Sequence, residues 1–496
     1  MLLPADRLLE LLLKELPRLG RDSESEASVS SRHAALLTVQ LLLARELGGP
    51  QQGQARLRKL VDMLDAYVRE LPTSAAAVRD SVAALRARAL AVMNGSDLRQ
   101  SESAWRGLLM DIEELSGELR MLSGVDDATR SRLTSILAAW ECSAEEAPPA
   151  RAATESTDVH LDQEQLTLYL RDRCGDPALQ VTAFHPLPGG FGKQTVLFDA
   201  RGKAFTGAFV LRRDFPLPLL DNDCHRIRHE FEVIRAVHAR GFPAPDALWL
   251  DIEHRLLPGG DFIVMRRSPG VSGGTVIRPE SKVPADLART LATLLARLHR
   301  LPPMPELRSL NATINATVWA LPLERCVQQY LESWLSLLHA TPHLPSPSTL
   351  SQLGWVLDHI PRASGEPVLL HGDLGFHNFL LDDGQLTTML DWEFSHVGDP
   401  AEDLASVRNS IGAALDWDTF VRCYRENGGR EIDMARVHFF QVWGHVRNAL
   451  STMFAARLCV DRRVDDIKFV LAAQVYLPHF IRAAQTLIEQ GPAGVS

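Results

Sequence analysis

The sequence predicts an α+β chain in three parts: a helical bundle, a lobe built on a small mixed sheet, and a mostly helical lobe with an embedded hairpin. Three observations predict this order. Strand signals are almost absent before about Cys142, strand-like runs gather between about Thr195 and Arg267, and helical patterns return from about Val283. In the last part, Asp383-Gly384 joins two apolar runs, as in a hairpin with a two-residue turn.

Length and composition limit the possible functions. A chain of 496 residues is expected to form two or three domains, and 46% hydrophobic with 23% charged residues is typical of a globular protein. The net charge of -10 disfavours nucleic acid and anionic membranes as partners. Six scattered cysteines without a CxxC pair favour a reducing compartment, and no run of about 18 uncharged apolar residues occurs. We therefore expect a cytoplasmic protein without a membrane span.

The first part, residues 1–142, is predicted to be a bundle of five or six helices. Leucine- or alanine-rich stretches alternate there with helix stop signals, which are Gly48-Gly49-Pro50, Leu71-Pro72, Asn94-Gly95 and Ser123-Gly124. Residues 143–157, "SAEEAPPARAATEST", have the small, polar, proline-containing composition of a linker. The bundle could form a homodimer, bind a protein partner or cover the acceptor site, and the sequence does not choose among these.

The second part, residues 158–267, is predicted to be the sheet lobe. Residues 195–216 predict two strands joined through Gly202, a helical stretch runs from about His225 to Arg240, and "ALWLD" and "DFIVMRR" predict two further strands. Residues 268–496 then form the helical lobe.

The hairpin in that lobe brings polar residues to one end. If Asp382 pairs with Gln385, counting outward places Asn378 opposite Met389 and leaves Asp391 two residues further along the returning strand. Asn378 and Asp391 are then diagonal neighbours.

Asp373 lies in the loop that leads into the same hairpin, so two carboxylates and a carboxamide are expected to converge. Two such charges about 5 Å apart repel by roughly 3 kcal/mol at an effective dielectric constant of about 20, so a positive charge should lie between them. Oxygen ligands from Asp and Asn, few in number, suit a magnesium ion that completes its shell with water and phosphate oxygens.

The spacing of these residues points to a kinase. Asp373 and Asn378 stand as D-x-x-x-x-N, the spacing of the kinase catalytic loop, in which the Asp accepts the substrate hydroxyl's proton and the Asn binds a metal. Asp391 begins "DWE" after the hairpin, where kinases have a metal-binding Asp. The sequence therefore predicts Asp373 as the catalytic residue and Asn378 and Asp391 as metal ligands.

The segment "HGDLGFHN…LDWEFSHVGDPAEDLA" resembles the aminoglycoside phosphotransferase and choline kinase family, small-molecule kinases with a protein-kinase-like fold. The resemblance runs from about Val181 to the carboxyl terminus and is greatest to the phosphotransferase domains found beside or fused to acyl-CoA dehydrogenases. It implies a two-lobed kinase-like domain that uses ATP and Mg²⁺.

The same resemblance implies a set of nucleotide-binding residues. "PGGFGKQTVLF" is similar to the family's nucleotide-covering loop, with Gly189, Gly190, Gly192 and Lys193. It is not a Walker A motif, because Gln194 stands where Ser or Thr would bind magnesium.

Three further positions complete the set. Arg212 in "FVLRR" occupies the phosphate-contacting position where many kinases have Lys, and Glu230 occupies the position of its ion-pair partner. "FIVMRR" is similar to the hinge strand, whose backbone near Met265 would meet the adenine.

The acceptor is predicted to be a hydroxyl of a small molecule. Only seven residues separate Asp391 from Asp399 and no A-P-E follows, so there is no room for a protein kinase's activation loop. The resemblance suggests a hydroxyacyl-CoA or a related catabolic metabolite. Two alternatives stay open: an inactive kinase-like nucleotide-binding or regulatory protein, which Arg212 in place of Lys favours, and an aminoglycoside or choline-type kinase.

Other polar residues of this region have competing interpretations. His371, Asp373 and His377 could be ligands of a zinc or iron hydrolase, but that leaves Asn378 and Asp391 unexplained. A histidine that shapes the loop is the favoured interpretation of His371.

Acidic residues after Asp391 also have expected roles. Glu393 is either a carboxylate that supports the metal ligands or a surface acid. Asp399 and Asp403 are expected to cap a helix and brace the catalytic loop.

Overall fold

The structure is a computed structural model. It describes residues 50–70, 76–93, 110, 112, 127–141, 161–187, 192–215, 219–220, 222–253, 260–273, 284–431, 433–461, 463–464, 469 and 472–492. The chain forms two compact units, the first from residues 1–155, 341–359 and 445–496, the second from residues 156–340 and 360–444. The linear division into 1–142, 143–157, 158–267 and 268–496 stays a prediction.

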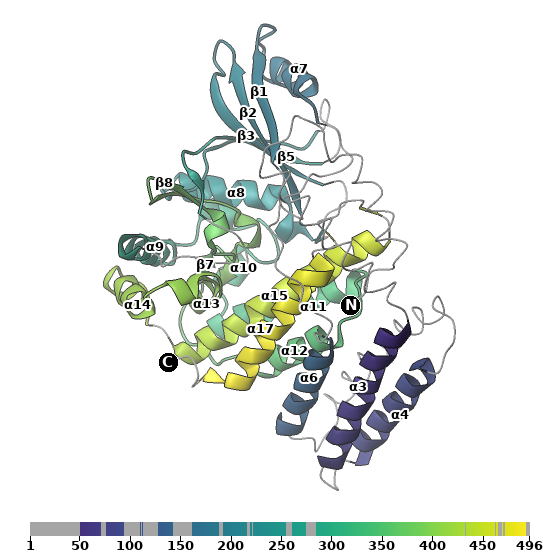
Figure 1. The fold of residues 1–496 in the computed structure, drawn as a ribbon. Helices are drawn as coiled ribbons and strands as arrows, with labels where there is room; N and C mark the ends of the chain where they lie inside the picture. The colour runs from purple at the N-terminus through teal and green to yellow at the C-terminus, as the bar shows by residue number, and fades with distance from the viewer. Residues whose placement is uncertain are drawn as a thin grey trace. The chain divides into compact units, whose positions relative to one another are not determined.

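The second unit contains an antiparallel sheet of order β1-β2-β3-β5-β4 (Figure 1). Its strands are β1 (Gln180–Leu187), β2 (Lys193–Arg201), β3 (Gly207–Asp214), β4 (Ala247–Asp251) and β5 (Phe262–Arg266). Val196, Phe198 and Leu211 are buried at alternate positions, as expected when one face of a strand packs against a core. Helix α7 (Gln163–Cys174) packs beside β1, and α8 (Ile227–His238) packs against β3, β4 and β5. The predicted order of two strands, a helix and two strands is confirmed.

The rest of this unit is mostly helical, as predicted. Its helices are α9 (Ala285–Leu298), α10 (Ala316–Trp319), α11 (Leu323–Ala340), α13 (Pro400–Ile411), α14 (Trp417–Glu426) and α15 (Met434–Val460), the last of which continues into the other unit. Single helical turns are η2 (Asp223–His225), η3 (Pro305–Leu307), η4 (Phe376–Asn378), η5 (Trp392–Phe394) and η6 (Gly412–Ala414). Helix α9 is amphipathic, because Leu287, Leu291, Leu295 and Leu298 recur at helical spacing and are all buried.

Short strands flank the loop that the sequence predicts to be catalytic. They are β6 (Val271–Ser272), β7 (Val368–Leu370), β8 (Phe379–Asp382), β9 (Gln385–Met389) and β10 (His396–Gly398), paired in the orders β6-β8-β9 and β10-β7. The Asp383-Gly384 turn between β8 and β9 is confirmed, since Asp382 pairs with Gln385.

The predicted register of this hairpin is wrong by one residue at its far end. Phe379, not Asn378, lies opposite Met389, because the pairing shifts between Leu380 and Leu381. The extra residue is Thr387, whose hydroxyl donates to the carbonyl of Pro269 at 2.8 Å and to that of Leu380 at 3.2 Å. Such a bulge places two residues of one strand against one of the other.

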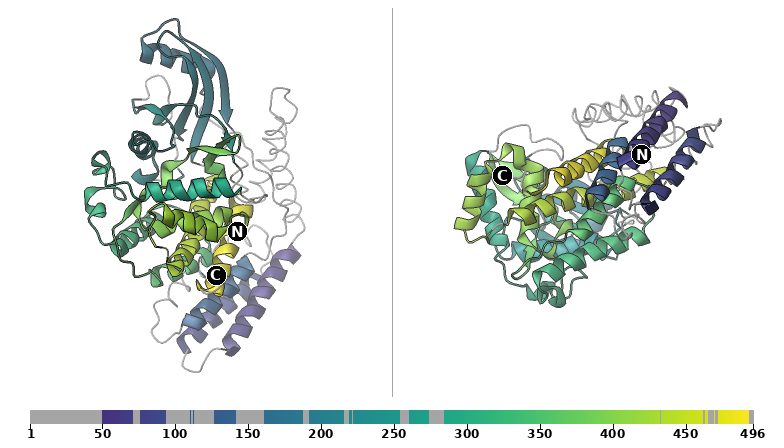
Figure 2. Two further views of the ribbon diagram at one scale, coloured as in Figure 1. Left: turned by 90° about the vertical axis from the view of Figure 1, so that its left-hand side faces the viewer. Right: turned by 90° about the horizontal axis from the view of Figure 1, so that it is seen from below.

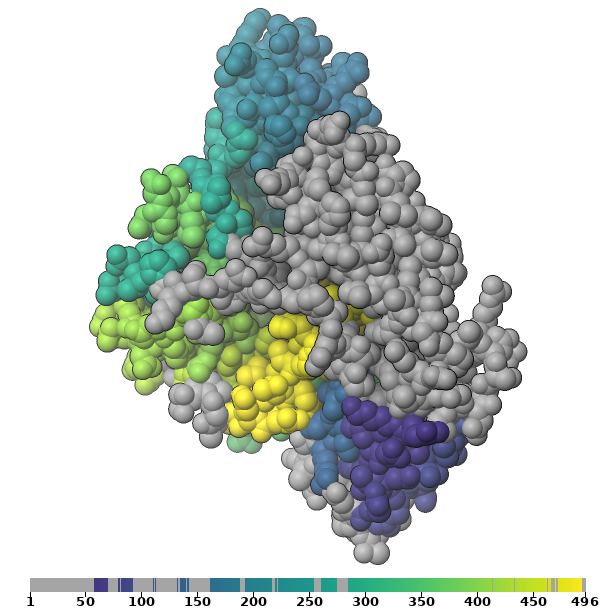
Figure 3. Space-filling model, in the orientation of Figure 1, coloured from purple at the N-terminus to yellow at the C-terminus, as the bar shows by residue number. Residues whose placement is uncertain are grey.

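The first unit contains α3 (Pro50–Glu70), α4 (Ala76–Met93), α6 (Asp127–Glu141), α12 (Pro347–Asp358), the π-helical turn η7 (Ala472–Tyr476) and α17 (Leu477–Gln490). Helix α3 lies beside both α4 and α6 (Figures 1 and 2), and the described residues of α3 and α4 form one continuous surface (Figure 3). The predicted stops at 71–72 and 94–95 lie outside the described residues, and α3 and α4 are described up to Glu70 and Met93. Residues 1–49 and the expected linker lie outside the described residues, so the predicted helix count is not tested.

Polar contacts join the helices of this unit. Glu141 at the end of α6 accepts from the hydroxyl of Ser346 at 2.7 Å and from the amide of Ser348 at 3.0 Å, and therefore caps the first turn of α12. Gln485 of α17 donates to the hydroxyl of Ser135 in α6 at 2.7 Å.

Two further expectations concern the described part of the chain. None of its helices combines the length and the apolar composition that crossing a membrane requires. Four of the cysteines that the structure describes are free thiols: Cys174, Cys224, Cys326 and Cys423.

Candidate active site

The catalytic loop begins where β7 ends and runs through η4 into β8. Asn378 is buried, and its side-chain amide donates to Asp373 twice, to Oδ2 at 2.9 Å and to the carbonyl oxygen at 2.9 Å. These two bonds fix the orientation of the Asp373 carboxylate relative to the loop backbone. The structure thus brings together the two residues of the predicted D-x-x-x-x-N pair.

A buried carboxylate holds the backbone of this loop. Asp403 accepts the amide of His371 at 3.0 Å and that of Gly372 at 2.8 Å, and His299 Nε2 lies 3.1 Å from the same carboxylate. Tyr424 bonds the other ring nitrogen of His299 at 2.8 Å. Burial alone would raise the pKa of Asp403, but the bonds from His299 and the loop amide lower it below its usual value. The predicted bracing role of Asp403 is confirmed.

Gly372 is required by the geometry of this loop. Its φ is +82°, and a Cβ atom there would lie 2.3 Å from the carbonyl oxygen of Phe394. Any larger residue would meet both backbone strain and a clash.

His371 connects the loop to the segment before Asp391. Its Nδ1 accepts the amide of Asp373 at 3.3 Å and its Nε2 bonds the carbonyl of Leu390 at 2.9 Å, which confirms the interpretation as a loop-shaping histidine. Burial lowers the pKa of His371, so the ring is neutral. Within the described ranges, no group of three or more His, Cys, Asp and Glu side chains is arranged to hold a metal ion, and both ring nitrogens of His371 are already engaged.

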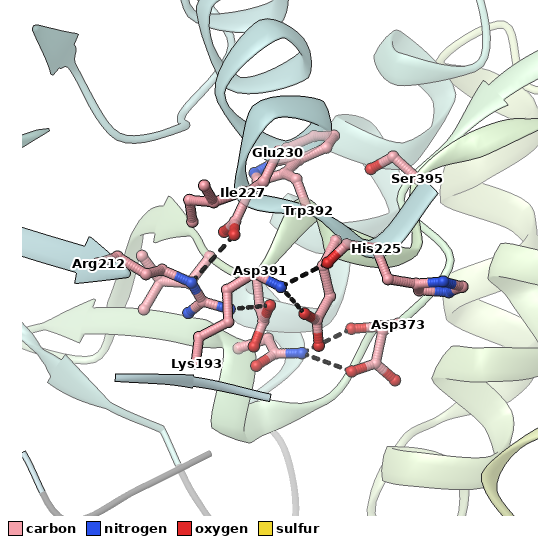
Figure 4. A network of polar contacts seen from close by, with 12 residues as sticks. Lys193, Arg212, His225, Ile227, Glu230, Asp373, Asp391, Trp392 and Ser395 are labelled. Atoms are coloured by element: carbon pink, nitrogen blue, oxygen red, sulfur yellow. Dashed lines mark hydrogen bonds and ion pairs between the residues drawn. The ribbon is translucent and has the colours of Figure 1, made fainter. Parts of the chain in front are cut away.

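Asp391 lies next to Arg212 (Figure 4). It follows β9 with left-handed backbone angles (φ 64°, ψ 64°), which Asp tolerates better than most residues. Arg212 Nη2 lies 2.5 Å from Asp391 Oδ1, and Arg212 Nε lies 3.0 Å from Glu230 Oε2. One guanidinium is therefore shared between a carboxylate of α8 and one of the hairpin.

Burial dominates the proton affinity of these two acids. It raises the pKa of Glu230 to about 7 although Arg212 opposes the shift. It also raises the pKa of Asp391, against Arg212 and with the help of the neighbouring charge of Glu393. Neither carboxylate is fully neutralised by the one guanidinium between them.

Lys193 makes a second set of contacts. Its ammonium lies 2.5 Å from Glu393 Oε2, 2.8 Å from the carbonyl of His225 and 3.7 Å from Asp214 Oδ1. Burial lowers the pKa of Lys193, but the charges of Glu393, Glu230 and Asp214 outweigh it and the net shift is upward. Glu393, which the sequence left open, is therefore part of an ion pair and not a free surface acid.

Of the remaining predicted residues, the structure describes Gly192 and Met265 but not the first two glycines of the loop. Gly189 and Gly190 lie outside the described residues. Gly192 lies over Glu393, since a Cβ atom there would be 3.8 Å from its Oε2. Met265 is buried near the end of β5, paired with Val210 and Ala247. The cluster thus gathers Asp373, Asn378, Asp391, Arg212, Glu230 and Lys193.

Four residues of the site were not predicted: Asp214, His225, His299 and Tyr424. Asp214 at the end of β3 and His225 in η2, just before α8, contact Lys193. His299, directly after α9, and Tyr424 in α14 support Asp403. Only Asp214 had a sequence signal, because it lies two residues after Arg212 on the same strand and therefore on the same face.

The donor set fits a divalent cation. Asp373, Asp391, Glu393, Glu230 and Asp214 outnumber the buried cations Arg212 and Lys193. Asn378 and Asp391 offer an amide and a carboxylate, the oxygen ligands that Mg²⁺ uses together with water and phosphate.

Residues 183–440, just over half of the chain, match the phosphotransferase enzyme family. The chain belongs to this family. As a phosphotransferase it is an enzyme of the small-molecule kinase class, and family membership agrees with the predicted α+β kinase-like fold.

Several relatives of this phosphotransferase are known by sequence. It is 29% identical over 201 residues to acyl-CoA dehydrogenase family member 11 of Gallus gallus and 30% identical over 203 residues to that of Rattus norvegicus. Each match covers 40% of this chain and 24% of the relative, so the chain spans about a quarter of these proteins. It is also 28% identical over 169 residues to viomycin phosphotransferase of Streptomyces vinaceus, which covers 31% of this chain and 52% of the relative.

Solved structures of two phosphotransferases are similar to the chain. Aminoglycoside phosphotransferase APH(4)-Ia, bound to AMP-PNP and hygromycin B, has a TM-score of 0.43 at 16% identity, covering 64% of this chain and 98% of the other. Spectinomycin phosphotransferase APH(9)-Ia, bound to ADP and spectinomycin, has a TM-score of 0.44 at 12% identity, covering 66% and 99%.

Proposed function

We propose that this phosphotransferase moves the γ-phosphate of ATP to a hydroxyl group of a small molecule, with Asp373 as the catalytic residue. The observation that carries the proposal is the meeting of Asp373, Asn378 and Asp391 beside the Arg212–Glu230 ion pair. This arrangement contains the groups that phosphoryl transfer needs: a base for the hydroxyl, oxygen ligands for a metal and a cation for the phosphate.

Each group has a distinct task in this reaction. Asp373 accepts the hydroxyl's proton, and Asn378 holds its carboxylate in place through Nδ2. Arg212, oriented by Glu230, places positive charge where the nucleotide's phosphates would lie. Gly189, Gly190 and Gly192 belong to the loop that would cover those phosphates, and the backbone near Met265 would meet the adenine.

Asn378 and Asp391 are the residues that would hold Mg²⁺. A bound magnesium ion neutralises charge on the transferring phosphoryl group and orients it. Asp391 Oδ1 lies against Arg212 in this structure, so Arg212 and the metal would share this carboxylate or exchange it.

A hydroxyacyl-CoA or a related catabolic metabolite is the proposed acceptor. The sequence similarity to acyl-CoA dehydrogenase family member 11 supports it, because the name of that relative links a segment similar to this chain with acyl-CoA chemistry. The match to viomycin phosphotransferase supports a second candidate acceptor, an antibiotic. The aminoglycoside or choline-type acceptor that the sequence left open belongs in the same test.

The test is ADP release with Mg-ATP and a panel of hydroxyacyl-CoAs, hydroxy acids, choline and aminoglycosides. We expect acceptor-dependent ADP release from the wild type and a decrease of about 10²–10⁴-fold in Asp373→Asn, the range that a catalytic base contributes. An inactive, nucleotide-binding protein is the rival. It would bind ATP equally well in both forms and release no ADP with any acceptor.

The proposal extends to the protein's surroundings. The free thiols described above suit a reducing, cytoplasmic compartment. The helices of residues 1–142 are the proposed surface for a homodimer or a protein partner, and light scattering of the full chain would give the oligomeric state.

A further inference from the structure

Lys193 lies at a junction of four elements near the candidate nucleotide site. It is the first residue of β2, directly after the glycine-rich segment, and its side chain is 4% exposed. Its three acceptors come from elsewhere: Glu393 from η5, the His225 carbonyl from η2 and Asp214 from the end of β3. Figure 4 shows its amine pointing toward the segment that begins with Asp391.

The ammonium group has little capacity left for a phosphate. Two of its three N–H donors are used by Glu393 Oε2 at 2.5 Å and by the His225 carbonyl at 2.8 Å, and the Asp214 carboxylate forms a longer ion pair at 3.7 Å. Moving it to a nucleotide would leave the Glu393 carboxylate, 19% exposed, without its cation. The contacts therefore favour a fixed position over direct phosphate binding.

The same junction includes the start of α8. Asp214 accepts the amide of Ile227, the first residue of α8, at 3.1 and 3.2 Å, and so caps that helix. Helix α8 carries Glu230, which orients Arg212. A cation at this junction thus connects the base of the loop, the position of α8 and the segment that carries Asp391.

We propose that Lys193 and Glu393 form an anchor that holds the base of the glycine-rich loop against the Asp391 segment. Both are positioning residues for the nucleotide, because they fix Gly192 and the start of β2 relative to the segment that carries Asp391. The proposal rests on the proposed nucleotide site and reinterprets Lys193 as a support of the loop and not as a phosphate ligand.

The test uses three variants of the full chain: Lys193→Met, Glu393→Gln and the double variant. ADP release gives KM for ATP, kcat and the Mg²⁺ concentration for half-maximal activity, and chemical denaturation gives stability. We expect each single variant to raise KM for ATP about tenfold, equal to roughly 1.4 kcal/mol. KM for ATP of the double variant should be no higher than that of the more impaired single variant, because both changes break the same pair.

Three other results would overturn the anchor. If Lys193→Met raises KM while Glu393→Gln does not, the lysine binds phosphate directly. If Glu393→Gln shifts the Mg²⁺ requirement and Lys193→Met does not, the glutamate is a metal ligand. If the effects of the two changes on KM for ATP add up in the double variant, or if neither change affects KM, the pair does not position the nucleotide.

Controls separate these outcomes from general damage. Lys203→Met, at an exposed lysine of the same lobe, and Glu306→Gln, at an exposed ion pair with Arg240, should leave KM unchanged. If Lys193→Met does not fold, the two Glu393 variants test the anchor. Glu393→Gln must then raise KM for ATP, and Glu393→Asp, which keeps the charge, must raise it less. Equal KM values for Glu393→Gln and Glu393→Asp contradict the anchor. If the wild type does not turn over ATP, the proposed function fails. The anchor is then tested by chemical denaturation alone: the losses of stability in Lys193→Met and Glu393→Gln should not add up in the double variant.

Discussion

Asp373 and Asp391 lie in the same site but are held in place by different partners. Asp373 accepts the side-chain amide of Asn378 at 2.9 Å, lies 3.6 Å from His377 Nε2, and belongs to a loop whose backbone the completely buried Asp403 supports. Asp391 is held by an ion pair with Arg212 of the sheet lobe, although the side chains of Asp373 and Asp391 are equally exposed, at 26%.

The difference separates a rigid side of the site from an adjustable one. On the Asp373 side, each buried polar group has a fixed partner within the helical lobe, and exchanging it would leave an unsatisfied group. On the Asp391 side, carboxylates from both lobes share few cations, and under the proposed function a metal ion and phosphate would replace some of the existing contacts. Under the proposed function, the base would thus be positioned before binding, while the ligands for metal and phosphate would complete their arrangement upon binding.

The largest expected effect is on the adjustable side. Asp391→Asn should lower kcat about 10³-fold, which corresponds to roughly 4 kcal/mol of transition-state stabilisation. The free energy of unfolding should change by less than about 1 kcal/mol, because Arg212 keeps Glu230 as its partner and Asn tolerates the left-handed backbone. ADP release and urea denaturation measure the two quantities. A large loss of stability would show that this side is as rigid as the other.

The next effect is on the rigid side. Gly372→Ala should destabilise the protein by about 3 kcal/mol, since it combines a positive φ with a clash against the Phe394 carbonyl. Urea denaturation gives the change, and Gly175→Ala is a matched control. Gly175 also has a positive φ, but no atom lies within 4 Å of its Cβ position. Equal effects of the two substitutions would mean that the loop yields to the added methyl group.

Asp403→Asn should cost about 2 kcal/mol at pH 7, because an amide cannot accept both loop N–H groups as the carboxylate does. The pKa of Asp403 is lower in the folded state than in the unfolded chain, so its charge stabilises the fold above the unfolded pKa of about 3.9. That contribution is lost as the pH falls from there through the folded pKa. The stability difference between wild type and variant should therefore shrink below about pH 4, as denaturation at pH 7 and pH 3 would show.

The sequence predicted the parts of the site that depend on local signals. From the Asp-Gly turn and the D-x-x-x-x-N spacing alone, the sequence predicted that Asp373, Asn378 and Asp391 lie close together, and the structure places them so. The bulge at Thr387 was not predictable, because it depends on a hydroxyl bond to Pro269, far away in the chain. The Lys193–Glu393 pair spans 200 positions, and the His299–Asp403 contact spans 104, so no local pattern reveals either.

The smallest expected effect lies in the hairpin that joins the two sides. Gly384 has a φ of +76°, and a Cβ atom there would meet no other atom within 4 Å, so Gly384→Ala adds backbone strain alone, about 1 kcal/mol. The turn lies at the far end of β8 and β9 from Asn378 and Asp391, and the Thr387 bulge holds the register between them. KM for ATP and kcat should therefore equal those of the wild type while the urea midpoint falls slightly. A change in KM would mean that strain at the turn passes through the bulge and moves Asn378 relative to Asp391, and the rigid and adjustable sides would then be mechanically coupled.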